Sequence, residues 1–323
     1  MGVIPKQQFQ TTVKDMKMMK TVIEHGEPLV IYPAGLMCED GLSTPIPSVT
    51  YKFLKWLDAD VYVARSYGSY FVMPKWTGGL RPGRTNIDIC KLFSKEELEA
   101  ISLENLKTAT DKALLFDAYR EQEKYLSKYA NNQKLNGLEH VLYQCPHCGK
   151  EFTITVKQGN TLSCTECGYA QFGDVYGFLQ NEQGIGPSLR YISDWSKQIF
   201  NNLKENIRQD PDYTLSVNTV IKMVNDAKHK FEEVGIGTLS ISSAGFHLEG
   251  TLKGAPFTLD VPVGNIPTLP FSPGKHLELQ HGNDIYRCVP EDGKLVMKFI
   301  NLVKIYYELR TEQSTQSKAK AFS

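Results

Sequence analysis

Apolar residues at the start of the chain recur at helical spacing and then gather in short runs. Across residues 11–25 they return every three or four positions, and Gly26 follows as a stop signal, which predicts a helix. The apolar runs at 28–33 and 60–65 predict buried strands, and residues 48–57 predict a helix between them. This alternation of helix, strand, helix and strand indicates an α/β layer.

The pattern becomes more polar after this layer. Residues 85–93, TNIDICKLF, alternate between apolar and polar positions and predict a further strand. Ser94 and Glu97 have the spacing of a capping box, and polar helical sequence runs from there to about Tyr129. We therefore expect a long, polar helical region to follow the strand.

The second half of the chain is predicted to be rich in strands and to close with a helix. Residues 193–207 have helical periodicity, and short alternating stretches with glycine turns begin at about Tyr213. Residues 294–310 form an amphipathic pattern that predicts the final helix. The order of these elements is similar to that of pleckstrin-homology-like barrels, a similarity of layout alone.

Composition describes a globular protein without an overall electrostatic preference. The chain has 323 residues, 41% of them hydrophobic, and its 36 Lys and Arg balance its 36 Asp and Glu. A neutral chain has no global field that steers it to nucleic acid or to an anionic bilayer, so such a partner requires a local patch. No apolar run approaches the roughly 18 residues of a membrane-spanning helix, and the amino terminus lacks a signal-peptide core. We expect a cytoplasmic protein whose membrane contact is at most peripheral.

Four of the seven cysteines form two identical knuckles. The spacing through Cys145, Cys148, Cys164 and Cys167 is C-x2-C-x15-C-x2-C, and a glycine follows each pair. This spacing predicts a zinc ribbon with two strands around the turn at 158–160. Four protein ligands complete a tetrahedron, so we expect structural zinc without an open position for catalysis. The other cysteines are scattered singly, as in a reducing compartment.

Zinc ribbons often bind nucleic acid, but the charge of this one disfavours that function. Its loop offers Lys150 and Lys157 against Glu151 and Glu166. This balance leaves too little positive charge to neutralise several phosphates, so we do not expect nucleic acid as a partner. His147, inside the first knuckle, is predicted to be a surface residue, because four cysteines already suffice.

Four segments of the first hundred residues follow one another in a recognisable order. They are GVIPKQQF at 2–9, LVIYPAGLMCEDG at 29–41, DVYVARSYGSYFVMPKW at 60–76 and RPGRTNIDI at 81–89. This order resembles the C-terminal half of a glycerophospholipid acyltransferase domain, from the superfamily of 1-acylglycerol-3-phosphate acyltransferases. The rest of the chain resembles the extended bacterial members, in which a long helix, a zinc ribbon and a β-rich tail follow. The resemblance implies acyl transfer from acyl-CoA or acyl carrier protein to a lysophosphatidate-like glycerol hydroxyl.

The sequence departs from this family in its catalytic residues. The family uses a His-x4-Asp motif whose histidine is the general base, and none of the seven histidines here has Asp five positions later. In the third family block Tyr32, Pro33 and Gly35 are kept, whereas Ala34 replaces the usual Glu. The chain is then either a fragment of a longer enzyme or a degenerate paralogue. Both explanations predict a chain that is incomplete or inactive alone.

We therefore predict an α/β fold in six parts. The parts are a partial acyltransferase-like α/β domain at 1–93, a helical connector at 94–136, the zinc ribbon at 137–178, a helical linker at 179–210, a β-rich, pleckstrin-homology-like domain with a C-terminal helix at 211–312, and a polar tail at 313–323. The first part is expected to hold the substrate site.

Candidate substrate-binding residues lie in this first part. They are Lys6, Gly35, Asp40, Arg65, Arg81 and Arg84. The resemblance places Lys6 in the phosphate pocket of the family. Arg81 and Arg84 flank a Pro-Gly turn, which suits a phosphate clamp, although surface cations near turns are usually solvated. Asp40 either replaces the missing carboxylate or is an ordinary turn residue.

The sequence thus favours an acyltransferase-family protein of phospholipid synthesis that works in the cytoplasm or at the inner face of the membrane. One alternative is a non-catalytic lipid-binding or scaffold protein derived from the same domain. A second alternative is a zinc-ribbon nucleic-acid binder.

Overall fold

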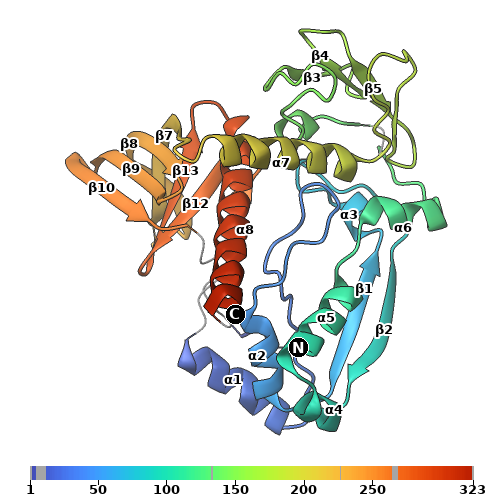
Figure 1. The fold of residues 1–323 in the computed structure, drawn as a ribbon, viewed down its shortest axis with the longest axis vertical. Coiled ribbons are helices and arrows are strands. Elements are labelled where there is room, and N and C mark those ends of the chain that lie inside the picture. The colour runs from blue at the N-terminus through green and yellow to red at the C-terminus, as the bar shows by residue number, and fades with distance from the viewer. Residues whose placement is uncertain (1, 5–11, 132–133, 226, 264–267, 322–323) are drawn as a thin grey trace.

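The computed structural model describes residues 2–4, 12–131, 134–225, 227–263 and 268–321, and these ranges contain antiparallel sheets of two, four and seven strands. Side-chain positions are described as far as residue 312. Helices connect the sheets and pack beside them (Figure 1). The chain is therefore a mixture of helix and sheet, with its strands grouped in three separate sheets.

The amino-terminal region, residues 12–116, is built around the two-stranded sheet. Its elements are α1 (Val13–Glu24), α2 (Val49–Leu57), β1 (Val61–Tyr67), α3 (Ser69–Val72), β2 (Asn86–Phe93), α4 (Lys95–Ala100) and α5 (Leu103–Leu114). Strands β1 and β2 pair with each other in antiparallel register. A small core of Tyr51, Phe93, Leu98 and Leu106 joins α2, β2, α4 and α5.

The ends of several helices follow local sequence signals. The Thr12 hydroxyl accepts a hydrogen bond from the Asp15 backbone N–H, and the Asp15 carboxylate accepts one from Thr12 N–H, so a capping box begins α1. Gly26 follows α1 with a φ of 75°, a conformation that glycine adopts readily. Ser94 and Glu97 form the predicted capping box of α4.

Two predictions for the first part of the chain are wrong. Residues 28–33 form neither helix nor strand. A strand needs a hydrogen-bonding neighbour, and in the described part of the chain β1 pairs with β2 and leaves no α/β layer for 28–33 to join. The long polar helical region is also interrupted, because Ser102 caps α5 and Asp117 caps a separate helix, α6 (Ala118–Tyr125).

The ribbon forms the four-stranded sheet. It follows a single 3₁₀ turn, η1 (Leu138–His140), and comprises β3 (Ile154–Lys157), β4 (Thr161–Cys164), β5 (Ala170–Gly173) and β6 (Leu179–Gln180) in that order. Gln158 and Gly159, both with positive φ, make the turn between β3 and β4. The predicted pair of strands around this turn is therefore confirmed.

The seven-stranded sheet forms most of the carboxyl-terminal half. Its strands are β7 (Leu215–Asn225), β8 (Lys230–Ser242), β9 (Gly245–Leu252), β10 (Ala255–Val261), β11 (Phe271–Ser272), β12 (His276–His281) and β13 (Asp284–Pro290), in the order β10-β9-β8-β7-β13-β12-β11. Glycine allows β8 and β9 to approach closely, because a Cβ on Gly250 would lie 2.2 Å from the Ile236 carbonyl oxygen.

One continuous core joins the ribbon, the seven-stranded sheet and the two long helices, α7 (Ile192–Gln209) and α8 (Leu295–Ala321). These helices cross beside the sheet (Figure 1), and Lys204 of α7 pairs with Glu308 and Glu312 of α8 at 2.6 and 2.9 Å. We call residues 117–312 the main body.

Within the described ranges, no helix combines the length and the apolar composition that crossing a bilayer requires.

Candidate metal centre and buried charge cluster

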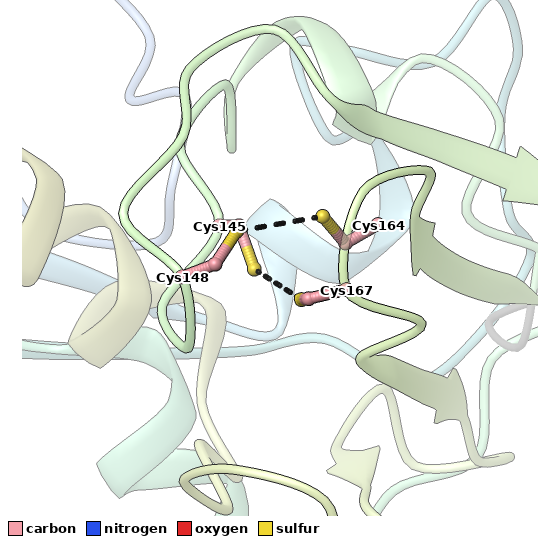
Figure 2. A group of neighbouring side chains, drawn as sticks. All are labelled: Cys145, Cys148, Cys164 and Cys167. Carbon is pink, nitrogen blue, oxygen red and sulfur yellow. Dashed lines mark hydrogen bonds between the residues drawn. The ribbon is translucent and has the colours of Figure 1, made fainter.

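Four cysteine thiols gather between the two knuckles (Figure 2). The Sγ atoms of Cys145 and Cys167 lie 3.7 Å apart, and those of Cys148 and Cys164 lie 3.8 Å apart. All four Sγ atoms lie within 4.8 Å of one another. A tetrahedral zinc ion with Zn–S bonds of about 2.3 Å would separate its thiolates by about 3.8 Å. The cluster could therefore hold a four-coordinate metal ion.

The two knuckles repeat the same backbone geometry. The Gly149 N–H donates to the Cys145 carbonyl at 3.0 Å, and the Gly168 N–H donates to the Cys164 carbonyl at 3.2 Å. Both glycines have a φ of 74°, a backbone conformation that residues with a Cβ rarely adopt. The glycine after each C-x2-C pair thus closes the turn that directs the two thiols of the pair inward.

Cys145 is buried, so its thiolate form needs a compensating positive charge. Burial raises the pKa of the Cys145 thiol well above its usual value, whereas a metal is bound by the thiolate. A bound cation would supply that charge. His147 is exposed and stacks on Tyr169, with 6.4 Å between the ring centroids, so it lies on the surface as predicted.

A second group of ionisable side chains lies where the amino-terminal region meets α8. Glu39 is 4% exposed and forms an ion pair with Lys304, which stands 265 positions later in the chain. Burial acts to raise the pKa of Glu39, but the positive charges of Lys304 and Lys75 lower it further than burial raises it. The carboxyl group therefore remains ionised inside the protein.

Asp40 and Lys75 complete this charge cluster. Asp40 accepts a hydrogen bond from the Leu42 N–H at 3.0 Å, and burial followed by the charge of Glu39 raises its pKa to about 6. The Lys75 amino group is buried without a hydrogen-bond partner among the described atoms, and burial lowers its pKa to about 8. It lies 3.3 Å from the Phe271 ring centroid, where a cation–π contact replaces part of its hydration.

The charge cluster balances two carboxylates with two ammonium groups. Its members come from the loop before α2, the segment after α3, and α8. Within this set Glu39 and Lys304 form the ion pair, and removing either one would leave an uncompensated buried charge. The arrangement therefore fixes the amino-terminal loop on α8.

The two arginines of the predicted phosphate clamp have different environments. Arg81 is 6% exposed; its Nη2 donates to the Lys134 carbonyl at 2.5 Å, and its guanidinium lies 4.7 Å from the Trp76 ring centroid. Arg84 is exposed, and its Nε donates to Asn86 at 3.4 Å. The cavity beside Arg84 holds only about 10 Å³, too little for a phosphate. The turn thus does not present both guanidinium groups to one ligand.

The other predicted substrate residues are dispersed. Gly35 is exposed in a turn with a φ of 66°, and the Arg65 guanidinium lies 5.6 Å from the Tyr67 ring centroid on β1. Lys6 lies outside the described residues. Of the predicted set, Asp40 is the residue that enters the charge cluster.

Sequence reasoning missed Glu39 and Lys304, although α8 carried a signal. Lys298, Asn301 and Lys304 recur every third residue along an otherwise apolar helix. In the structure Lys298 pairs with Glu151 at 2.5 Å, as Lys304 pairs with Glu39. A polar stripe on a buried helix thus indicates acidic partners on other elements.

The fold and the cysteine cluster define a protein of mixed helix and sheet with a four-cysteine ribbon that could bind a metal. No family model, curated protein or solved structure matches the chain. The resemblance to the acyltransferases therefore rests on the four sequence segments and their order.

Proposed function

We propose that the protein serves acyl transfer in phospholipid synthesis, and that this chain supplies a lipid-facing part without turning over alone. The donor is acyl-CoA or acyl carrier protein, and the acceptor is a lysophosphatidate-like glycerol hydroxyl. The order of the acyltransferase-like segments supports this chemistry. The surface of α1 supports peripheral contact with the inner face of the membrane.

Helix α1 carries the main observation in favour of a lipid-facing role. Val13 is 70% exposed, and Met16, Met18 and Met19 are half-buried, so part of the apolar surface of this helix faces solvent. Lys14 and Lys17 are exposed on the same helix, beside a depression of about 500 Å³. Val30 and Tyr32, 74% and 85% exposed, add apolar surface in the loop that follows. A helix with exposed lysines and partly exposed apolar side chains suits the interface of an anionic bilayer.

The described residues of the amino-terminal region do not assemble a general base for acyl transfer. His25 is exposed there, and its Nδ1 lies 2.7 Å from the Thr21 carbonyl oxygen rather than a carboxylate. A histidine–carboxylate pair occurs at His247 and Asp260, 2.7 Å apart, on β9 and β10 of the seven-stranded sheet. These side chains are 45% and 77% exposed, and they lie outside the acyltransferase-like segments. We therefore expect no turnover by this chain alone.

We assign structural zinc to the cysteine cluster, because four thiolates leave no open coordination position. The ribbon shares its core with α7 and α8, so we infer that it stabilises the packing of the main body. Nucleic-acid binding gains no support, since Lys150 is already paired with Glu166 at 2.5 Å. The closing helix beside a seven-stranded antiparallel sheet is compatible with a pleckstrin-homology-like layout.

Flotation with vesicles tests the lipid-facing role. The chain should float with vesicles containing anionic phosphatidylglycerol and should float less with phosphatidylcholine alone. Lys14→Glu combined with Lys17→Glu should reduce flotation several-fold, because it reverses two positive charges on the membrane face. Lys112→Glu with Lys128→Glu is the matched control, since these exposed lysines lie on other elements. Equal flotation of both double variants would contradict the role of α1.

An acyl-transfer assay tests the chemical part of the proposal. Labelled acyl-CoA or acyl carrier protein and lysophosphatidate should give no product above background with the purified chain. Product formation would show that a base is present and would overturn the expectation of inactivity. Adding a polypeptide that carries the His-x4-Asp half of such a domain should restore transfer, and failure to do so would count against acyl transfer.

A further inference from the structure

A polar pocket of about 480 Å³ opens on the seven-stranded sheet. Its basic lining comes from Lys222 on β7, Lys275 just before β12, His276 at the start of β12, and Arg287 on β13. A volume of this size is typical of small-molecule sites. The pocket is therefore large enough for a small anion with an organic group attached.

Arg287 is held rigidly at the base of this pocket. It stands opposite Lys222 on one side and Glu278 on the other in the strand register. Its Nε and Nη2 donate to the Glu278 carboxylate at 2.9 and 2.6 Å, and its guanidinium lies 3.4 Å from the Phe231 ring centroid. These contacts leave Nη1 to face a ligand, since a guanidinium carries donors on all three nitrogens.

The two lysines provide the uncommitted positive charge. Among the residues that the structure describes, neither the Lys222 nor the Lys275 ammonium group has a hydrogen bond or an ion pair. Glu291 also lines the pocket, but its carboxylate accepts a hydrogen bond from Asn218 at 3.2 Å. The charges of Arg287 and Glu278 cancel each other. The two lysines and Glu291 then leave one net positive charge at the pocket. This small excess suits a single phosphate better than a polyanion.

His276 contributes a neutral ring to the same site. Burial lowers its pKa to about 4, and the positive charges of Arg287, Lys275 and Lys222 act in the same direction, while Glu278 opposes them. The imidazole is thus uncharged near pH 7 and can donate one hydrogen bond without adding charge. Its Nε2 lies 3.7 Å from the Glu278 carboxylate, and the residue lines the pocket.

We propose that this pocket binds a phosphate monoester, with Lys222, Lys275 and Arg287 contacting the phosphate oxygens. Phe231, Val289 and Pro290 form the apolar part of the lining and would contact the organic portion of the ligand. Charge-assisted hydrogen bonds from ammonium and guanidinium groups are the usual means of holding phosphate in proteins. The site lies in the main body and does not depend on the proposed acyl transfer.

Titration of the zinc-loaded chain with glycerol 3-phosphate tests this site. Calorimetry should detect binding that weakens with salt, and NMR should show the pKa of His276 rising on saturation, because a bound dianion stabilises the imidazolium. Lys222→Gln with Lys275→Gln should weaken binding at least tenfold. Lys230→Gln, an exposed lysine outside the pocket lining, is the control and should leave binding unchanged.

Vesicles containing phosphatidic acid distinguish a lipid headgroup from a free phosphate ester. If glycerol 3-phosphate and the vesicles both lose binding in the Lys222→Gln, Lys275→Gln variant, soluble esters are sufficient ligands. If only vesicle binding is present and is lost in that variant, the phosphate belongs to a lipid. The Lys14→Glu, Lys17→Glu variant should keep its affinity for glycerol 3-phosphate, which separates this site from α1. Absence of binding to both probes, or binding unchanged by the pocket substitutions, would overturn the proposal.

Discussion

The amino-terminal region and the main body differ in how far they bury their apolar residues. The main body has one core that runs through the ribbon, α7, α8 and the seven-stranded sheet. The amino-terminal region has a separate core of four buried residues and adds Phe71 and Trp76 to the main core. It also contributes most of the exposed large apolar side chains. Apolar residues are therefore buried in the main body but often exposed in the amino-terminal region. The reason is that an apolar face is buried only where a second layer of helices or strands covers it. An uncovered apolar surface marks an interaction site more often than a core.

The largest expected effect concerns the metal centre of the main body. Cys145→Ser should abolish stoichiometric zinc and unfold the ribbon, because metal binding to such sites contributes on the order of 10 kcal/mol to folding. Metal analysis and thermal unfolding measure this effect. Cys90→Ser, on the exposed face of β2, is the control in the other region and should change stability by less than about 0.5 kcal/mol. A folded, metal-free Cys145→Ser protein would contradict the structural role of the metal.

The next effect concerns the ion pair that joins the two regions. Lys304→Met should destabilise the protein by about 3–5 kcal/mol, because it leaves the Glu39 carboxylate buried without its cation. Chemical denaturation measures the change. Adding Glu39→Gln should recover much of the loss, since the double variant no longer buries an unpaired charge. If the double variant is as unstable as the single one, packing rather than charge explains the effect.

The small core allows a test of how independent the amino-terminal region is. Leu106→Ala should cost about 2–4 kcal/mol, because the leucine is fully buried. Hydrogen exchange should then accelerate in α2, α4 and α5 and stay unchanged in the ribbon. Leu142→Ala, a fully buried residue of the main body, is the matched comparison and should accelerate exchange there. Identical exchange patterns for both variants would mean that the two regions unfold as one unit.

The smallest effect concerns the pH dependence of the charge cluster. The pKa of Asp40 is about 6 in the folded protein and about 3.9 in an unfolded chain, so between these values the folded state binds more protons. The protonated Asp40 carboxyl group therefore stabilises the folded protein fully below about pH 4, and this contribution is lost as the pH rises through about 6. Asp40→Asn should be more stable than the natural protein at pH 7.5, by about 1–3 kcal/mol, and equal to it near pH 4. A less stable variant at pH 7.5 would show that the Asp40 charge is needed.

The sequence allowed the prediction of features that depend on near neighbours. The cluster of four cysteines follows from two C-x2-C pairs with their glycines. The strand at 61–67 follows from the apolar run at 60–65, and the strand at 86–93 follows from alternating apolar positions. The predicted capping box at Ser94 likewise needs only residues three positions apart. These features were predictable because the interactions that form them lie within one turn, one strand or one hairpin.

The tertiary structure decided the features that depend on distant partners. Residues 28–33 have the composition of a buried strand, but in this fold they have no strand partner and remain outside the sheets. Glu39 is paired with a lysine 265 positions away, and the basic pocket needs side chains from β7, β12 and β13. The sequence by itself thus determined the cysteine cluster and most helices. Chain topology alone decided which charges meet inside the protein and which apolar faces remain uncovered, because both depend on where distant elements pack.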